Sequence, residues 1–100
     1  MKVIYSKDAL ESLREIVDFL DYRWTQKELN TFRKDLEKLV ETLQKGTIHF
    51  PKIMMDKPLH YALIGKKQVK VYFDLSEDSV EFLLFLPSKA NPQKLLNLLQ

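Results

Sequence analysis

The fold is decided by residues 59–86, LHYALIGKKQVKVYFDLSEDSVEFLLFL. Apolar and polar residues alternate in three runs, residues 59–64, 69–75 and 79–86, which short polar segments separate. A period of two is typical of strands, and such short connections join antiparallel neighbours. The last run is apolar on both faces, which predicts a more central place in the sheet. The stretch therefore predicts an antiparallel meander of three strands.

The residues before this stretch predict two adjacent helices. Ser6 suits an N-cap, and residues 25–28, TQKE, have the form of a capping box that begins a second helix. Gly46 is placed to end that second helix in a left-handed conformation. Apolar residues repeat at helical spacing at Leu10, Leu13, Val17, Leu20 and Trp24 in the first helix and at Leu29, Phe32, Leu36, Leu39, Val40 and Leu43 in the second. The very short connection forces an antiparallel pair.

The remaining segments complete the expected architecture. Residues 2–5 read as a short strand, and residues 46–57 lack a sustained period and form a loop. We therefore expect residues 1–100 to be a single α+β domain of order β-α-α-β-β-β, with the helical hairpin on one face of a small, mainly antiparallel sheet. An amphipathic tail follows, containing Leu95, Leu96, Leu98 and Leu99. It is either a last helix or a surface for a partner.

Composition excludes several classes of protein. One hundred residues with 45% hydrophobic content provide a single modest core, which argues against a large cofactor-binding enzyme. The absence of cysteine removes disulfides, thiolate catalysis and cysteine-ligated metals. No apolar run approaches the roughly 18 to 20 residues of a membrane span, so we expect a cytoplasmic protein without membrane contact.

Motifs for cofactor, metal or nucleophilic chemistry are also missing. The two glycines cannot build a nucleotide-binding Gly-rich turn, and His49 and His60 lack the carboxylates of a metal motif. We expect neither a cofactor nor a metal. The serines, namely Ser6, Ser12, Ser76, Ser79 and Ser88, are explained as caps, helix surface or turns.

Charge is distributed unevenly although the net charge is only +2. The helical half is balanced, whereas five lysines of the second half are opposed in the same stretch only by Asp56. These are Lys52, Lys57, Lys66, Lys67 and Lys70, and two histidines add groups that titrate near neutral pH. The region is interpreted either as a surface for an anionic partner or as ordinary solvated surface.

Several short segments, taken in order, resemble the RelE/ParE superfamily of type II toxin–antitoxin toxins. They are Ser6-Lys7-Asp8-Ala9, Trp24-Thr25, Leu59 to Ala62, Val71-Tyr72-Phe73 and Lys89-Ala90-Asn91-Pro92. They correspond to the family's Ser-x-x-Ala, Trp-Ser, Leu-Arg, Tyr-Tyr-Arg and Arg-Gln-Asn-Pro positions. The resemblance covers nearly the whole chain and implies a toxin that is neutralised by a cognate antitoxin.

The resemblance implies two different activities on one fold. One branch is a ribosome-dependent, metal-independent endoribonuclease, for which the catalytic candidates are His60, Lys70, Tyr72 and Lys89. The other branch inhibits DNA gyrase by binding and needs no catalytic set. In both cases Lys52, Lys57, Lys66 and Lys67 are candidates for contacting the target, and Leu95, Leu96 and Leu99, with the helical hairpin, for contacting the antitoxin.

The chain departs from the nuclease pattern at three positions. His60 and Lys89 stand where relatives carry arginine, and Phe73-Asp74 replaces Tyr-Arg. Lysine lacks the bidentate fork of arginine, and a carboxylate repels phosphate. The sequence therefore leans toward a binding protein that blocks gyrase or translation. The nuclease and an inactive relative that only binds protein stay open, as does the assembly, either a homodimer or a toxin–antitoxin hetero-oligomer.

Overall fold

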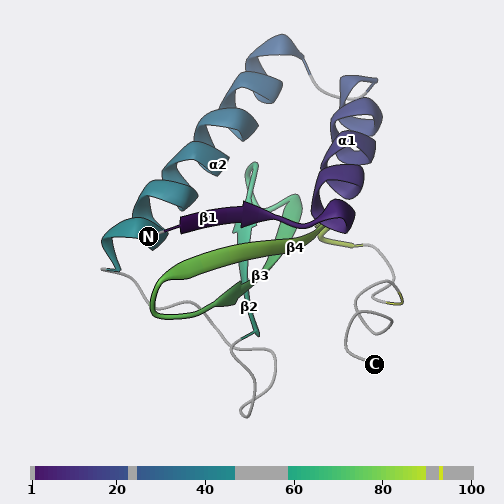
Figure 1. Ribbon diagram of the computed structural model, residues 1–100. Helices are drawn as coiled ribbons and strands as arrows, with labels where there is room; N and C mark the ends of the chain where they lie inside the picture. The colour runs from purple at the N-terminus through teal and green to yellow at the C-terminus, as the bar shows by residue number, and fades with distance from the viewer. Residues whose placement is uncertain (1, 23–24, 47–58, 90–92, 94–100) are drawn as a thin grey trace.

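The computed structural model describes residues 2–22, 25–46, 59–89 and 93 (Figure 1). Its elements are β1 (Lys2–Tyr5), α1 (Lys7–Asp21), α2 (Gln26–Lys45), β2 (Leu59–Ile64), β3 (Val69–Leu75) and β4 (Ser79–Pro87). This is the expected α+β order, and the predicted element types are confirmed. The tail with Leu95 to Leu99, expected as either a last helix or a partner surface, lies outside the described residues.

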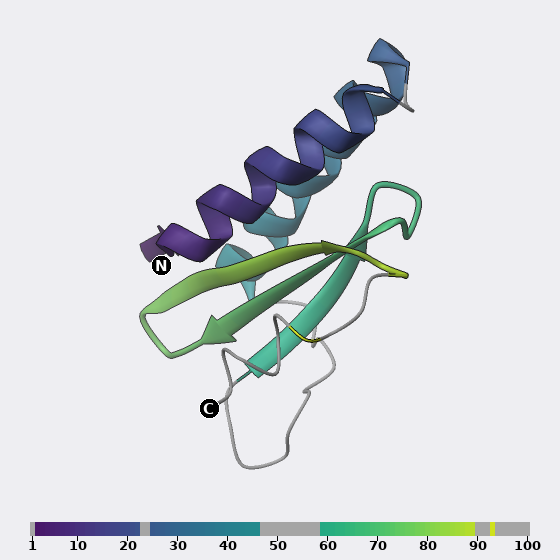
Figure 2. The same ribbon diagram turned by 90° about the vertical axis from the view of Figure 1, so that its right-hand side faces the viewer.

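The four strands form one sheet in the order β1-β4-β3-β2. β1 runs parallel to β4, while β4 pairs with β3 and β3 with β2 in antiparallel fashion. β4 thus has a neighbour on each side, as its two apolar faces predict. Both helices lie on the same face of the sheet (Figures 1 and 2). We call this the helix face. The opposite side, which neither α1 nor α2 covers, is called the open face, although several of its side chains are buried.

Local hydrogen bonds explain where the helices begin and end. The Ser6 hydroxyl accepts the Ala9 N–H at 3.0 Å, which caps α1. Thr25 and Glu28 form the predicted capping box, with reciprocal bonds of 3.3 and 3.2 Å. Gly46 ends α2 at a φ of 66°, a left-handed conformation that glycine adopts at little cost.

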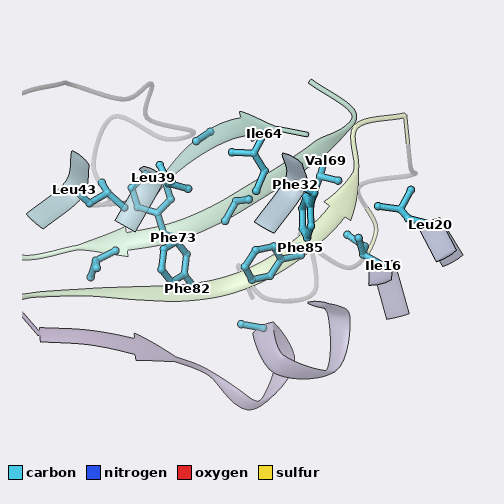
Figure 3. Close-up of a cluster of buried hydrophobic side chains, with 14 residues drawn as sticks. Ile16, Leu20, Phe32, Leu39, Leu43, Ile64, Val69, Phe73, Phe82 and Phe85 are labelled. Carbon is cyan, nitrogen blue, oxygen red and sulfur yellow. The ribbon is translucent and has the colours of Figure 1, made fainter. Parts of the chain in front are cut away.

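The core lies between the helices and the sheet (Figure 3). Phe73, Phe82 and Phe85 are fully buried, and Phe82 lies with its ring centroid 6.0 Å from each of the other two. The helices contribute the buried side chains Ala9, Ile16, Leu20, Phe32, Leu39 and Leu43. Burial of these apolar groups is the main stabilising contribution to a domain of this size.

The predicted apolar stripe of α1 is wrong in part. Leu20 is buried, but Leu10 and Val17 are 52% and 40% exposed. The face of α1 that meets the sheet instead carries Ala9 and Ser12, together with Ile16. Small side chains at the contact let a helix approach β4 closely, and the backbone of β4 supplies a partner for the Ser12 hydroxyl. The expected core residue Trp24 lies outside the described residues.

A β-bulge in β4 shapes the contact with the start of α1. Tyr72 pairs with Leu84 but Phe73 pairs with Phe82, so that Leu83 is the extra residue. The Ser6 hydroxyl donates to the Leu83 carbonyl at 3.3 Å, and the Ser6 N–H donates to the Phe82 carbonyl at 3.0 Å. The first turn of α1 is therefore attached to the bulge.

Candidate functional site

Strand pairing assigns each candidate side chain to a face of the sheet. Tyr61 lies opposite Tyr72, and Tyr72 lies opposite Leu84. Directly paired residues point to the same face, and neighbours along a strand point to opposite faces. The open face consequently carries Tyr61, Lys70 and Tyr72, while Val71 and Phe73 point into the core on the helix face.

Lys70 lies between two tyrosine rings on the open face. Its Nζ is 4.6 Å from the centre of the Tyr61 ring and 5.9 Å from that of Tyr72. A cation over an aromatic face is attracted by the ring quadrupole, so both rings hold this ammonium in place. We call Tyr61, Lys70 and Tyr72 the open-face cluster.

Tyr72 is the buried member of the open-face cluster. Its side chain is 5% exposed and packs among Leu59, Leu84 and Leu86. This burial raises the pKa of the Tyr72 phenol above its ordinary value, and the neighbouring Tyr61 raises it further. The phenol therefore stays protonated at neutral pH and is suited to donating a hydrogen bond, while its raised pKa makes it a weaker acid than an exposed tyrosine.

Tyr61 was not among the predicted site residues. The sequence feature from which Tyr61 could be found is the length of the turn between β2 and β3. Four residues separate Ile64 from Val69, which are paired, and counting back along both strands brings Tyr61 opposite Tyr72. The position of Tyr61 thus depends on the register of the hairpin and not on any local motif.

His60 does not join the open-face cluster. It pairs with Phe73 and stacks on its ring, with 5.7 Å between ring centroids and an interplanar angle of 13°. Because Phe73 belongs to the core on the helix face, the sheet separates His60 from Lys70 and Tyr72. Of the predicted catalytic set, the structure brings together Lys70 and Tyr72 only.

The open face also carries acidic groups. Asp74 lies two residues from Tyr72 on the same face and is paired with Glu81 of β4. A phosphate that approached Lys70 along β3 would be repelled at the Asp74 end of the strand. This arrangement agrees with the departure from the nuclease pattern at position 74.

The predicted target-contacting lysines fall into two groups. Lys66 and Lys67 are exposed in the turn between β2 and β3, and Lys89, which belongs to the predicted catalytic set, is exposed just after β4. Lys52 and Lys57 lie outside the described residues, as do Leu95, Leu96 and Leu99. Their proposed roles stay predictions.

A groove separates the two helices on the outside of the core. Its volume is about 310 Å³. Its apolar lining comes from Leu13 and Val17 on α1 and from Leu29, Phe32 and Leu36 on α2, and its polar lining from Gln26, Asn30 and Arg33. Figure 1 shows the two helix axes diverging from the connection between them. The Val17 side chain, which a sequence stripe places in the core, is therefore part of an accessible apolar surface.

Comparison with known proteins adds no family assignment, because neither the family models nor the curated proteins searched match this chain. Within the described residues no group of three His, Asp or Glu side chains is arranged to hold a metal ion. In the same part of the chain, neither helix is both long and apolar enough to cross a membrane.

Proposed function

We propose that this chain is the toxin component of a type II toxin–antitoxin system, which acts in the cytoplasm by binding DNA gyrase or a component of translation and is neutralised by a cognate antitoxin. The observation that carries the proposal is the apolar groove between α1 and α2, which lies on the fold that the resemblance predicts. An apolar groove between helices accepts the apolar face of a further helix.

The lining of the groove specifies the kind of segment it accepts. Leu13, Val17 and Leu36 offer apolar surface, while Arg33 adds a positive charge on the side of α2. Gln26 and Asn30 bond to each other through their side-chain amides at 3.3 Å. The complementary segment is an amphipathic helix with an apolar stripe and an acidic residue beside it, and an antitoxin segment that folds on binding has this chemistry.

Binding is favoured over catalysis by the separation of the candidate residues. A nuclease of this kind needs cations and a proton-transfer group around one phosphate. His60 lies on the helix face, Lys70 and Tyr72 lie on the open face, and Asp74 lies beside them. A binding protein tolerates this arrangement, because its action depends on surface contacts alone.

A ribosome-dependent endoribonuclease is the second candidate, and the open-face cluster favours it. Lys70 would contact the scissile phosphate as a point charge, and the protonated Tyr72 would donate a hydrogen bond to a phosphate oxygen. Water would take the proton of the attacking 2′-hydroxyl and return one to the leaving 5′-oxygen. Such an enzyme would work without His60 and without a metal.

The test of the proposed function is induced expression in bacteria with separate labelling of protein and DNA synthesis over the first minutes. Early loss of DNA synthesis supports gyrase as the target, and early loss of protein synthesis supports translation. The Lys70→Gln, Tyr72→Phe variant separates the mechanisms, because it abolishes arrest by a nuclease and leaves arrest by binding intact. If neither protein synthesis nor DNA synthesis changes, the proposal that the chain is a toxin is wrong.

We expect a short reading frame beside the gene to encode the antitoxin, and the groove is tested by co-expressing that reading frame. Val17→Glu places a charge in the groove and should abolish rescue by the antitoxin while arrest persists. Leu10→Glu is the matched control, because Leu10 is exposed on the same helix but does not line the groove. Equal loss of rescue in both variants would contradict the groove as the antitoxin site.

A further inference from the structure

The turn between β2 and β3 places two lysines in an unusual backbone conformation. The Gln68 N–H donates to the Gly65 carbonyl at 3.1 Å, which closes a four-residue turn. Its two central residues, Lys66 and Lys67, have φ values of 58° and 66°. Hairpin turns with two left-handed residues favour Asn-Gly, since this conformation brings Cβ close to the following carbonyl oxygen and only Gly, Asn and Asp adopt it readily. Two lysines therefore occupy positions where the backbone conformation favours asparagine and glycine.

Hydrogen bonds attach both ends of this turn to the rest of the fold. Asp35 on α2 accepts the Gly65 N–H through Oδ2 at 3.0 Å. At the other end, the Gln68 carbonyl accepts the Ser88 N–H at 2.8 Å. The turn is thus held by α2 on one side and by the chain leaving β4 on the other, so its lysines project from a supported backbone.

The second of these bonds brings a third lysine to the same end of the sheet. Lys89 follows Ser88 directly, and Lys67 precedes Gln68 directly, so the hydrogen bond joins the two backbones one residue from each lysine. Val69 is also paired with Pro87. We call Lys66, Lys67 and Lys89 the lysine end. All three side chains are exposed.

Among the described residues, two carboxylates lie near the lysine end, and neither forms an ion pair with it. Asp35 accepts the Gly65 N–H, and Glu28, which lines a shallow pocket with Lys66, accepts the Thr25 N–H in the capping box. Within the described part of the chain no salt bridge joins any of the three lysines to a carboxylate. The three exposed lysines therefore outnumber the two nearby carboxylates, which do not contact them directly.

We propose that the lysine end binds the phosphate backbone of a nucleic acid through contacts that do not depend on sequence. Lysine ammoniums act as point charges on phosphates, and neutralising phosphates releases condensed counterions. A nucleic-acid strand offers phosphates at a regular spacing along its backbone, so several ammoniums at one end of the sheet can contact it together. The inference rests on the proposed function for its biological setting, a target that contains RNA or DNA, but its binding chemistry is independent of growth arrest.

The test measures binding of the purified full-length chain to fluorescein-labelled single-stranded RNA and duplex DNA by anisotropy, over a range of salt concentrations. The Lys66→Gln, Lys67→Gln, Lys89→Gln variant should weaken binding and reduce the slope of log K against log salt by about two to three. The charge-matched control is Lys7→Gln, Lys34→Gln, Lys38→Gln, which removes three exposed helix lysines. Its slope should be unchanged. Tighter binding of RNA points to translation, and tighter binding of DNA points to a gyrase–DNA complex.

Three results would overturn the inference. The first is an equal loss of nucleic-acid affinity in both triple variants, which would mean that binding responds to net charge only. The second concerns polyglutamate, used as a model of an acidic protein. If the chain binds polyglutamate as tightly as the nucleic acids, and if this binding needs the same three lysines, the partner is an acidic protein. The third is no binding of the unmodified chain at low salt. Growth arrest without nucleic-acid binding overturns this inference alone, and binding without arrest overturns the toxin proposal alone.

Discussion

The Ser12 hydroxyl on α1 accepts the Phe85 N–H of β4 at 2.9 Å, in a buried site between residues 73 positions apart in the chain. The same hydroxyl donates to the Ala9 carbonyl at 3.1 Å, so both of its hydrogen-bonding functions are used. This pair attaches the helix to the central strand just beyond the bulge. A buried polar residue thus helps to hold α1 against the sheet.

Ser12→Ala should lower the free energy of unfolding by about 1 to 3 kcal/mol, because the Phe85 N–H would remain buried without an acceptor. Urea denaturation followed by circular dichroism measures the loss. Ser76→Ala is the control, since the Ser76 hydroxyl also bonds to a backbone carbonyl, that of Ser79, but in an exposed turn. A loss of similar size in the control would argue against a special role for the buried bond.

Alkaline pH should destabilise the fold through Tyr5 and Tyr72. Burial raises the pKa of both phenols above the ordinary value of 10.0, because it disfavours the phenolate. Above that pH the unfolded chain releases protons that the folded chain keeps, so the free energy of unfolding falls as pH rises. The stabilising contribution is complete below about pH 10 and is lost above it.

Urea midpoints measured from about pH 9 to pH 11 test this expectation. The Tyr5→Phe, Tyr72→Phe variant should show a shallower alkaline decline than the unmodified chain. Tyr22→Phe is the control, because that side chain is 93% exposed. An identical decline in all three proteins would mean that groups other than the two buried phenols control alkaline unfolding.

Replacing the two lysines of the turn between β2 and β3 should stabilise the fold and weaken nucleic-acid binding. Lys66→Asn with Lys67→Gly provides the residues that two left-handed positions favour, and we expect a gain of about 1 to 2 kcal/mol in the free energy of unfolding. The urea midpoint should rise with an unchanged m-value. Nucleic-acid binding should weaken in the same variant. A lower midpoint would contradict the left-handed conformation of these residues.

His60→Phe should retain the fold and any growth arrest. The ring of His60 stacks on Phe73 on the helix face, and another aromatic ring preserves this contact. We expect the free energy of unfolding to change by less than about 1.5 kcal/mol. Growth curves after induction, with equal protein levels verified by immunoblot, make the measurement. Loss of arrest in a folded variant would restore His60 as a functional residue.

The elements were predictable because their signals are local. Caps at Ser6 and Thr25, the stop at Gly46 and the alternation in residues 59–86 each act within a few positions of the chain. The buried face of α1 was not predictable from its leucines. Large apolar residues at Leu10 and Val17 outweigh Ala9 and Ser12 in any count of hydrophobicity, yet a close helix–sheet contact needs the small residues.

The candidate site, like the fold, was predictable from the sequence only in part. Lys70 and Tyr72 are two residues apart on one strand, so alternation alone places them on the same face. The partnership with Tyr61 and the exclusion of His60 depend on the register of β2 against β3. The proximity of Lys89 to the turn depends on one long-range backbone bond.

The sequence by itself determined which segments are helices and strands, their order, and the alternating faces of each strand. Tertiary structure alone decided that β1 joins β4 in parallel, that Ser12 meets Phe85, and that an apolar groove opens between the helices. The physical reason is the range of the interactions. Dihedral preferences and caps operate between near neighbours, whereas register and packing arise from contacts between residues far apart, whose free energies exist only once the chain has folded.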